Sequence, residues 1–194
     1  MITRNFLDEK IRKIPNFPKA GILFYDITTL FEDAGAFRGV IDEMSGRYNS
    51  QKIDKVVGID ARGFLLASAL AYKLGAGISI VRKQGKLPHK TNQASYEKEY
   101  GPDIIEMHQD TIKPGENILI VDDLLATGGT MLAACELVKK SAGKIAGIEV
   151  VINLSFLPGL AKLQEQGYIV NYLIDYDNEN MRALNNYETL SSRA

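Results

Sequence analysis

Five short runs rich in valine and isoleucine recur along the chain, each bounded by glycine or by charged residues. They lie at 55–59, 78–81, 118–121, 148–152 and 170–174. Their apolar positions are nearly continuous rather than alternating, which indicates strands covered on both faces, as in a parallel sheet. Helical patterns fill the gaps at 63–74 and 130–141 and, more weakly, at 158–166. Strands that alternate with helices predict a doubly wound α/β domain with right-handed crossovers.

The chain as a whole is that of an ordinary globular protein. Its 194 residues suit a single domain, 1–194, with a sizeable core. A formal net charge of −1 argues against a nucleic-acid-binding surface, which normally needs a basic face. The start of the chain lacks the pattern of a signal peptide, and no apolar run approaches the roughly 20 residues of a membrane span. With Cys135 as the one cysteine, we expect a cytoplasmic protein with no disulfide.

Two regions do not fit the alternation of strands and helices. The segment 1–34 opens with an amphipathic pattern and continues with Pro15, Pro18 and Gly21, which predicts a helix and then an irregular segment placed to cover a site. The segment 84–114 is long and polar, and connections of this length are usually functional lids or disordered inserts. Its middle predicts a hairpin with a turn at Gly101.

The most specific motif follows the apolar run 118–121. Two acids come first, and a glycine-rich turn then leads into a helix, at the sheet edge where ligands of open parallel sheets bind. Gly128 and Gly129 allow the backbone to point several N–H groups at one anion, and the helix adds its own amides. Thr127 and Thr130 supply hydroxyl donors. No lysine follows the glycines, which excludes the nucleoside-triphosphate loop.

The adjacent acids Asp122 and Asp123 narrow the choice of ligand. They would repel a phosphate that they faced, but they suit a sugar whose hydroxyls lie over them and whose phosphate lies further along the loop. A strand followed by an acid and a glycine turn also occurs in many α/β proteins without this function. The whole run 122–130 nevertheless matches a pattern far more specific than its glycines alone.

This run resembles the 5-phosphoribosyl-1-pyrophosphate (PRPP) signature of type I phosphoribosyltransferases. The resemblance implies their fold: a mainly parallel sheet of about five strands flanked by helices, with an N-terminal hood segment and a flexible hairpin lid. It implies that Asp122 and Asp123 hold the ribose hydroxyls and that magnesium is carried mainly by diphosphate and ribose oxygens. The 5-phosphate would lie in the loop formed by Ala126, Thr127, Gly128, Gly129 and Thr130.

The stretch 11–28 resembles the N-terminal segment of the adenine-specific members of that family. The resemblance implies that Leu23 and Phe24 flank the adenine ring, with Phe24 stacked on it, and an aromatic face suits a flat purine. Taken alone, Phe24 would more often be a core residue. The family often has arginine at the position of Tyr25, so no side-chain role is carried over to that residue.

Two blocks at other strand ends resemble diphosphate-binding positions of the family. Asp60, Ala61 and Arg62 precede a helix, and amides with one guanidinium suit a diphosphate, so Arg62 would be the charged arm. Arg82 and Lys86 belong to a cluster of three cations and would be further diphosphate neighbours. Each block also has a non-functional interpretation. Arg62 could close a turn at the surface, and the charged run with Arg82 and Lys86 could be a solvated face.

The stretch 95–101 resembles the mobile catalytic loop of the family. By that resemblance Glu99 acts on the purine ring and Tyr100 reaches the diphosphate. A charged hairpin tip without any function would have a similar composition, but the succession of glutamate, tyrosine and glycine favours the catalytic interpretation.

Together these motifs predict a purine salvage enzyme that transfers the phosphoribosyl group from PRPP to adenine and releases AMP and diphosphate. The resemblance also implies a homodimer. The net charge of −1 and the lack of a long apolar run predict that it binds neither nucleic acid nor membrane. One alternative is the same chemistry on hypoxanthine, guanine or xanthine. Another is a non-catalytic regulator that binds PRPP, but such a protein needs a nucleic-acid-binding module or a basic surface, and the sequence shows neither.

Overall fold

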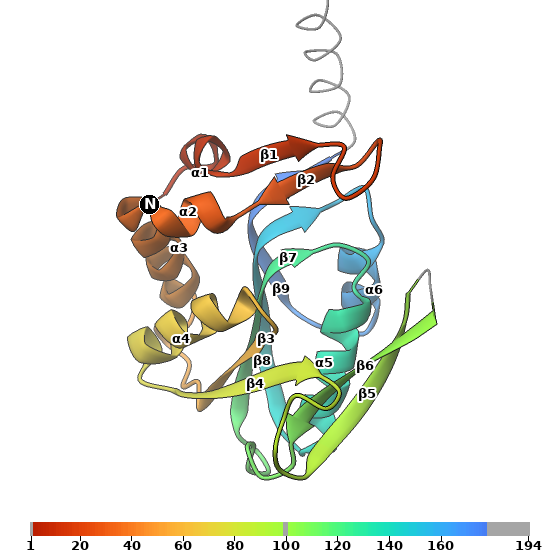
Figure 1. Cartoon of the computed structure of the whole chain (residues 1–194). Coiled ribbons are helices and arrows are strands. Elements are labelled where there is room, and N and C mark those ends of the chain that lie inside the picture. Colours follow the sequence, from red (N-terminus) through yellow and green to blue (C-terminus); the bar gives the residue numbers. More distant parts are fainter. Residues whose placement is uncertain (1, 99–100, 178–194) are drawn as a thin grey trace, which may run out of the picture.

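The computed structural model describes residues 2–98 and 101–177 and is built on a seven-stranded sheet (Figure 1). The strand order is β5-β6-β4-β3-β7-β8-β9, and the five strands from β4 to β9 in this order pair in parallel. All five predicted runs are strands of that parallel core, which confirms the α/β prediction. Their bounds are β3 (Lys55–Ile59), β4 (Gly77–Lys83), β7 (Asn117–Leu125), β8 (Lys144–Leu154) and β9 (Val170–Tyr176).

Helices cover both faces of this sheet. The three helices predicted between the strands are present as α4 (Gly63–Leu74), α5 (Gly129–Lys140) and α6 (Gly159–Glu165). Two more, α2 (Thr28–Glu32) and α3 (Ala34–Gly46), were not predicted. In the described part of the chain, no helix is long and apolar enough to cross a membrane.

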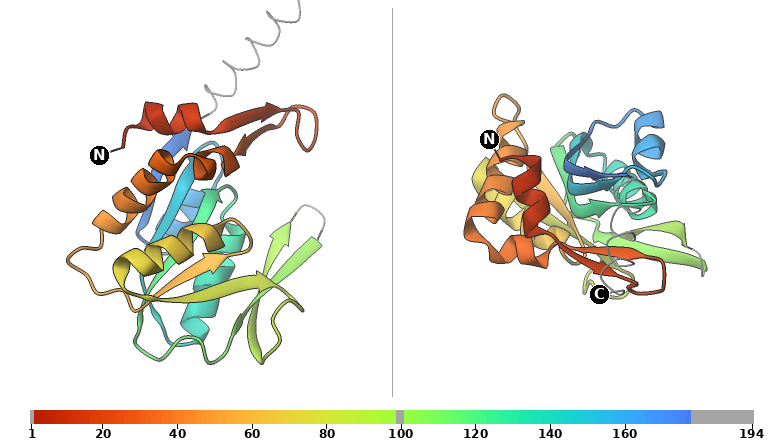
Figure 2. Two further views of the ribbon diagram at one scale, coloured as in Figure 1. Left: turned by 60° about the vertical axis from the view of Figure 1, so that its left-hand side comes forward. Right: turned by 90° about the horizontal axis from the view of Figure 1, so that it is seen from above.

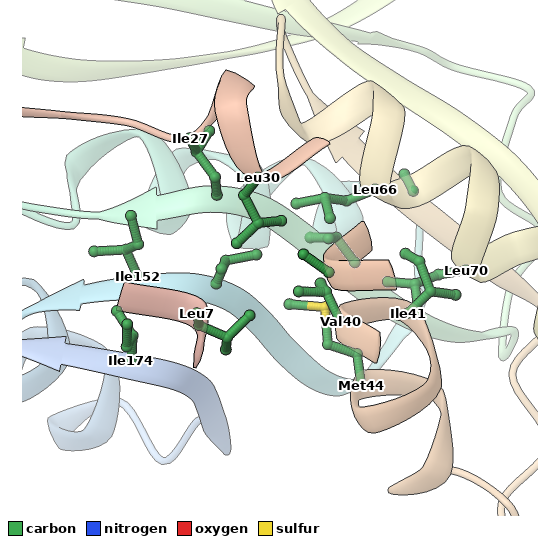
Figure 3. Packing of buried hydrophobic residues seen from close by; sticks show 14 of the residues in the cluster. Leu7, Ile27, Leu30, Val40, Ile41, Met44, Leu66, Leu70, Ile152 and Ile174 are labelled. Carbon is green, nitrogen blue, oxygen red and sulfur yellow. The ribbon is translucent and has the colours of Figure 1, made fainter. Parts of the chain in front are cut away.

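Strand β7 shows why the apolar runs are continuous. Leu119 and Val121 belong to the hydrophobic cluster under α3 and α4, whereas Ile118 and Ile120 belong to the cluster under α5. All four side chains are completely buried. Burying each contributes about 1.5–3 kcal/mol, so the strand is held from both sides. Figure 3 shows the first cluster, in which Leu66 and Leu70 of α4 pack near Val40, Ile41 and Met44 of α3.

The N-terminal segment is more regular than its sequence predicts. After α1 (Arg4–Lys10), β1 (Arg12–Pro15) and β2 (Leu23–Asp26) pair as an antiparallel hairpin, separate from the main sheet. The prediction of an irregular segment was therefore wrong for these residues. Asn16 and Gly21 have positive φ angles of 57° and 83°, and the Asn16 side chain accepts a hydrogen bond from the Gly21 amide at 2.9 Å. This hood hairpin, residues 12–26, lies beyond the carboxyl ends of β7 and β8 (Figure 1).

The predicted hairpin in the 84–114 segment is confirmed. β5 (Thr91–Lys98) and β6 (Gly101–His108) pair antiparallel, and residues 99–100 between them lie outside the described residues. β6 also pairs with the end of β4, through Arg82 with Glu106 and Lys83 with Ile105. The lid hairpin, formed by β5 and β6, thus extends the main sheet and is not a separate insert. Its two strands lead away from the edge of the sheet (Figure 2).

Candidate active site

A cavity of about 380 Å³ lies at the carboxyl ends of β3, β4 and β7, where the sequence places the ligand. It brings together predicted residues that are far apart in the chain. Its lining comprises Ile59, Asp60, Ala61, Arg62, Arg82, Lys83, Tyr96, Ile105, Asp122, Asp123, Leu124 and Thr130.

Asp122 and Asp123 lie within β7 and not in a loop after it. The strand continues to Leu125, and Asp122 pairs with Val150 of β8. Strand geometry therefore fixes the backbone of both acids, and Asp123 is almost completely buried. Burial, and next the negative charge of Asp123, raise the pKa of Asp122 well above its ordinary value. Two carboxylates held this closely are suited to accept hydrogen bonds from neutral hydroxyl groups.

Arg62 forms an ion pair with Asp123, which the sequence did not predict. Its Nε donates to Asp123 Oδ2, and its guanidinium carbon lies 6.0 Å from the centroid of the Phe24 ring. The side chain is 44% exposed, so it remains accessible from the cavity. Arg62 therefore connects the acids of β7 to the hood hairpin, and it offers a partly exposed charge to an anion bound nearby.

Arg82, the second arginine of the cavity, is held by a series of polar contacts. Arg82 donates to Asp60 at 3.0 Å through Nε and to the carbonyl of Lys86 at 3.2 Å through Nη1. The amides of Lys86 and Leu87 each donate to Glu106 Oε1 at 3.1 Å. Lys86 is exposed and lies outside the cavity lining, unlike Arg82.

Glu106 is a functional support that the sequence analysis missed. Its carboxylate is buried, which by itself raises its pKa, but hydrogen bonds from Leu87, Thr91 and Lys86 outweigh burial and lower the pKa below its ordinary value. The available signal was an acid inside the apolar run 104–107. Glu106 therefore stays ionised and fixes the loop that carries Lys86.

The glycine loop packs directly against the start of α6. Gly128 has a φ of +82°, and a Cβ there would lie 2.9 Å from the Cα of Gly159. The amide of Gly159 donates to the carbonyl of Ala126 at 3.1 Å, and a Cβ on Gly159 would lie 2.3 Å from that same oxygen. Both positions therefore need glycine. Sequence reasoning missed Gly159, since nothing local shows which backbone it meets.

A small hollow of about 90 Å³ lies inside this loop. Its lining includes all five predicted phosphate-binding residues: Ala126, Thr127, Gly128, Gly129 and Thr130. The loop leads into α5 at its positive end, which favours an anion. The size and the donors suit one phosphate group.

Tyr96 of the lid hairpin lies over the first residue of α5. A Cβ on Gly129 would lie 2.9 Å from Tyr96 Cδ2, so the ring rests on the glycine backbone. The Tyr96 hydroxyl lies 3.3 Å from Asp103 on the neighbouring strand. Tyr96 belongs to the stretch 95–101, in which roles were predicted only for Glu99 and Tyr100. Its ring forms a contact between the lid hairpin and the glycine loop.

The hood residues Leu23 and Phe24 are half-buried and lie outside the cavity lining. The Phe24 ring packs edge-on against Phe17, with the centroids 5.1 Å apart. Their link to the cavity is the contact between Phe24 and Arg62. The predicted catalytic residues Glu99 and Tyr100 lie outside the described residues.

Comparison with known proteins bears on the same site. Residues 28–185 match the family model of the phosphoribosyl transferase domain. An adenine phosphoribosyltransferase of Trichlorobacter lovleyi is 56% identical over 155 residues, which are 80% of this chain and 91% of the relative. The chain belongs to the adenine phosphoribosyltransferase family. It is accordingly an enzyme of the pentosyltransferase class.

Solved structures of this family confirm the fold. The crystal structure of adenine phosphoribosyltransferase from Thermoanaerobacter pseudethanolicus has a TM-score of 0.85 and 44% identity, covering 90% of this chain and all of that one. The Saccharomyces cerevisiae enzyme, crystallised with an imino-altritol bisphosphate and adenine, has a TM-score of 0.82 and 40% identity over 88% of this chain and 97% of its own. The type I phosphoribosyltransferase fold predicted from the sequence is thus confirmed.

Proposed function

We propose that this chain transfers the 5-phosphoribosyl group from PRPP to adenine and releases AMP and diphosphate, as a purine salvage enzyme. The observation that carries the proposal is the meeting of three parts at one sheet edge. These are the glycine loop that leads into α5, the acids of β7, and the cations at the carboxyl ends of β3 and β4. They match the phosphate, the ribose and the diphosphate of PRPP in their order along that molecule.

The donor binds through the loop and the acids. The 5-phosphate lies in the hollow of 126–130, where backbone amides and the hydroxyls of Thr127 and Thr130 donate to it. The ribose hydroxyls lie over Asp122 and Asp123. When the ribose displaces Arg62 from Asp123, the guanidinium becomes free to turn toward the diphosphate. Holding the sugar in this way places its anomeric carbon in line with the base.

The leaving diphosphate binds at the backbone of Asp60 and Ala61 and at the side chains of Arg62, Arg82 and Lys86. The residues present fit a magnesium ion that is held mainly by oxygens of the substrate. Asp122 and Asp123 lie beside the proposed ribose position, where their carboxylate oxygens would face such an ion. Within residues 2–98 and 101–177 no cluster of three or more His, Cys, Asp or Glu side chains is placed to hold a metal alone. Bound magnesium would neutralise charge on the diphosphate as it departs.

The base binds between Leu23 and Phe24 of the hood segment 1–34. Glu99 takes part in proton transfer with the purine. Tyr100 reaches the diphosphate from the lid segment 84–114. Positive charge grows on the ribose as the diphosphate leaves, and the two acids of β7 stabilise it. Closure of the lid excludes water, which otherwise competes with the base as nucleophile.

The experiment is a panel of bases assayed with PRPP and magnesium. The release of diphosphate is measured for each base. We expect AMP from adenine and a much slower reaction of hypoxanthine, guanine and xanthine. Reaction of hypoxanthine or guanine at the rate of adenine would move the proposal to the other purine class. Tight PRPP binding without turnover of any base would favour the regulator instead.

We further propose that the single domain 1–194 works as a cytoplasmic homodimer. Exposed apolar side chains support an assembly surface near α4: Leu65 and Tyr72 of this helix are 52% and 91% exposed, and Ile78 of the following strand β4 is 43% exposed. The buried thiol of Cys135 suits a reducing compartment. Light scattering of Tyr72→Asp against the parent protein tests the assembly, and an unchanged mass would locate the interface elsewhere.

A further inference from the structure

The hood hairpin is attached to the main sheet through two stacked tyrosines. The ring of Tyr25, in β2, lies parallel to that of Tyr176, the last residue of β9, with centroids 4.0 Å apart and an interplanar angle of 16°. Both residues are buried, with 4% and 3% of their surfaces exposed. A stacked aromatic pair contributes more to the attachment than its buried area alone.

Two charged residues complete this cluster, which we call the aromatic clamp: Asp8, Lys13, Tyr25 and Tyr176. The Tyr176 hydroxyl donates to Asp8 Oδ1 at 2.5 Å, and Lys13 Nζ donates to Asp8 Oδ2 at 2.7 Å. Lys13 also lies 5.8 Å from the centroid of the Tyr176 ring. Burial disfavours the Asp8 charge, but the bonds from Lys13 and Tyr176 outweigh it and lower the pKa of Asp8.

The clamp stands on a firmly held part of the sheet. The carbonyl of Tyr176 accepts a hydrogen bond from the Ser155 amide at 3.0 Å, at the end of β8. Arg4 donates to the carbonyl of Asp175, and Asn153 donates to the Asp175 carboxylate at 2.6 Å. Tyr176 is therefore the fixed partner, and the hood hairpin is the part that it holds.

The register of the hood hairpin links the clamp to the base site. Tyr25 pairs with Lys13, so both clamp residues of the hairpin lie on one face. Successive residues of a strand point to opposite faces, so Phe24 points away from the clamp, and its ring lies near Arg62. Adjacent residues of β2 therefore carry the anchored ring, Tyr25, and the ring next to Arg62, Phe24.

The tyrosine hydroxyls have different surroundings. The Tyr176 hydroxyl is bonded to Asp8, whereas the Tyr25 hydroxyl is buried and has no hydrogen-bond partner among the described residues. The Tyr25 ring therefore acts by stacking alone, and its hydroxyl adds nothing to the clamp. This asymmetry makes the two tyrosines respond differently to the same substitution.

We propose that the aromatic clamp sets the position of Phe24 over the base site, so that Tyr25 and Tyr176 are positioning residues for the purine. The inference rests on the proposed adenine-binding role of the hood. Neither tyrosine lines the cavity or the hollow assigned to PRPP. The clamp therefore acts on base affinity and leaves the affinity for PRPP unchanged.

Steady-state kinetics of four variants test this inference. In Tyr25→Ala and Tyr176→Ala we expect the KM for adenine to rise about tenfold, because displaced binding groups lose their aligned contacts, while the KM for PRPP stays within about twofold. Tyr25→Phe keeps the stack and retains the parent KM for both substrates. Tyr176→Phe keeps the ring but loses the Asp8 bond, and we expect a rise of about threefold, the small effect of one hydrogen bond.

Tyr172→Ala is the matched control, because this tyrosine lies on the same strand and is 37% exposed. It should leave both KM values at those of the parent. Equal rises in both KM values for Tyr25→Ala, or none, would overturn the inference, as would a large effect of Tyr25→Phe.

A second readout does not depend on turnover. Hydrogen exchange of the amides in 12–26 should become faster in Tyr176→Ala and stay at the parent rate in Tyr172→Ala, with β3 and β7 unchanged in both. If hood exchange is unaltered, the clamp is overturned even when the enzyme makes AMP. If the parent makes no AMP yet hood exchange responds as expected, the proposed function fails while the clamp stands.

Discussion

The two halves of the site are held in different ways. The donor half is built from backbone contacts inside the core: β7 carries both acids, and the glycine loop touches α6 with no room for a methyl group. The base half is a separate two-stranded hairpin held through side-chain contacts, which include the stacked rings of Tyr25 and Tyr176. Backbone packing leaves the donor site little freedom, whereas stacked rings allow the hood to be loosened without disturbing the sheet. We therefore expect lesions in the two halves to have separable effects.

The largest expected effect comes from Gly159→Ala. The new methyl group would lie 2.3 Å from the carbonyl oxygen of Ala126, so the phosphate loop must shift. We expect PRPP affinity to fall about 100-fold, because a displacement of this kind misplaces every donor in the loop. Isothermal titration calorimetry with PRPP measures this loss of affinity.

Gly46→Ala serves as the control for that variant. Gly46 lies in α3, and a Cβ there meets nothing within 4 Å. It should leave PRPP binding unchanged and stabilise the helix by up to about 1 kcal/mol. If Gly159→Ala bound PRPP like Gly46→Ala, the phosphate loop would not depend on its contact with α6.

A smaller effect is expected from Asp123→Asn. The amide keeps the shape of the side chain but loses the charge that pairs with Arg62. In the proposed function this carboxylate also accepts a hydrogen bond from the ribose. Since hydrogen bonds to charged groups contribute about 1.5–3 kcal/mol, PRPP affinity should fall by roughly 10- to 100-fold. Asp42→Asn, which removes an exposed ion pair with Lys73, is the control. Parent-like PRPP affinity in Asp123→Asn would remove the ribose assignment.

The smallest effect is a pH dependence that comes from Asp122. Its pKa is raised in the folded protein, so acidification protonates it before an ordinary carboxyl group, and PRPP affinity should weaken as the pH falls through that raised pKa. The sign for stability is the opposite, because folding favours the protonated form. The contribution of Asp122 to the free energy of unfolding is complete below its unfolded pKa and is lost as pH rises through the folded pKa.

Asp122→Asn separates this titration from that of the PRPP phosphates. We expect the variant to bind more weakly at neutral pH and to show less loss of affinity on acidification than the parent protein. Titrations over the same pH series provide the comparison. Identical pH profiles for the two proteins would show that Asp122 does not titrate in the binding range.

The sequence predicts the strands around the proposed donor site better than it predicts the hood hairpin, for physical reasons. Runs such as 118–121 are apolar on both faces, which is a local pattern with a single structural outcome. The contact of Gly159 with Ala126 and the pairing of Arg62 with Asp123 join distant residues, and no local signal records them. The hood hairpin depends on positive φ angles at Asn16 and Gly21, and its sequence has proline where strands usually continue.

The lid hairpin likewise has one feature that the sequence predicts and one that it does not. Its two strands were predictable as a hairpin from local pattern, but the pairing of β6 with β4 depends on which edge of the sheet is free. Helix α3 was missed although five of its residues are buried against the rest of the core. Tertiary packing, rather than local propensity, decides such elements.

The separation of the two halves is tested most directly by measuring both KM values in Asp123→Asn and in Phe24→Ala. Asp123 is buried in β7, and Phe24 lies on the face of the hood opposite the clamp. We predict that the first variant raises the KM for PRPP with little change for adenine, and that the second raises the KM for adenine alone. If both KM values rise together in either variant, the two halves are not independent and this description of the site is wrong.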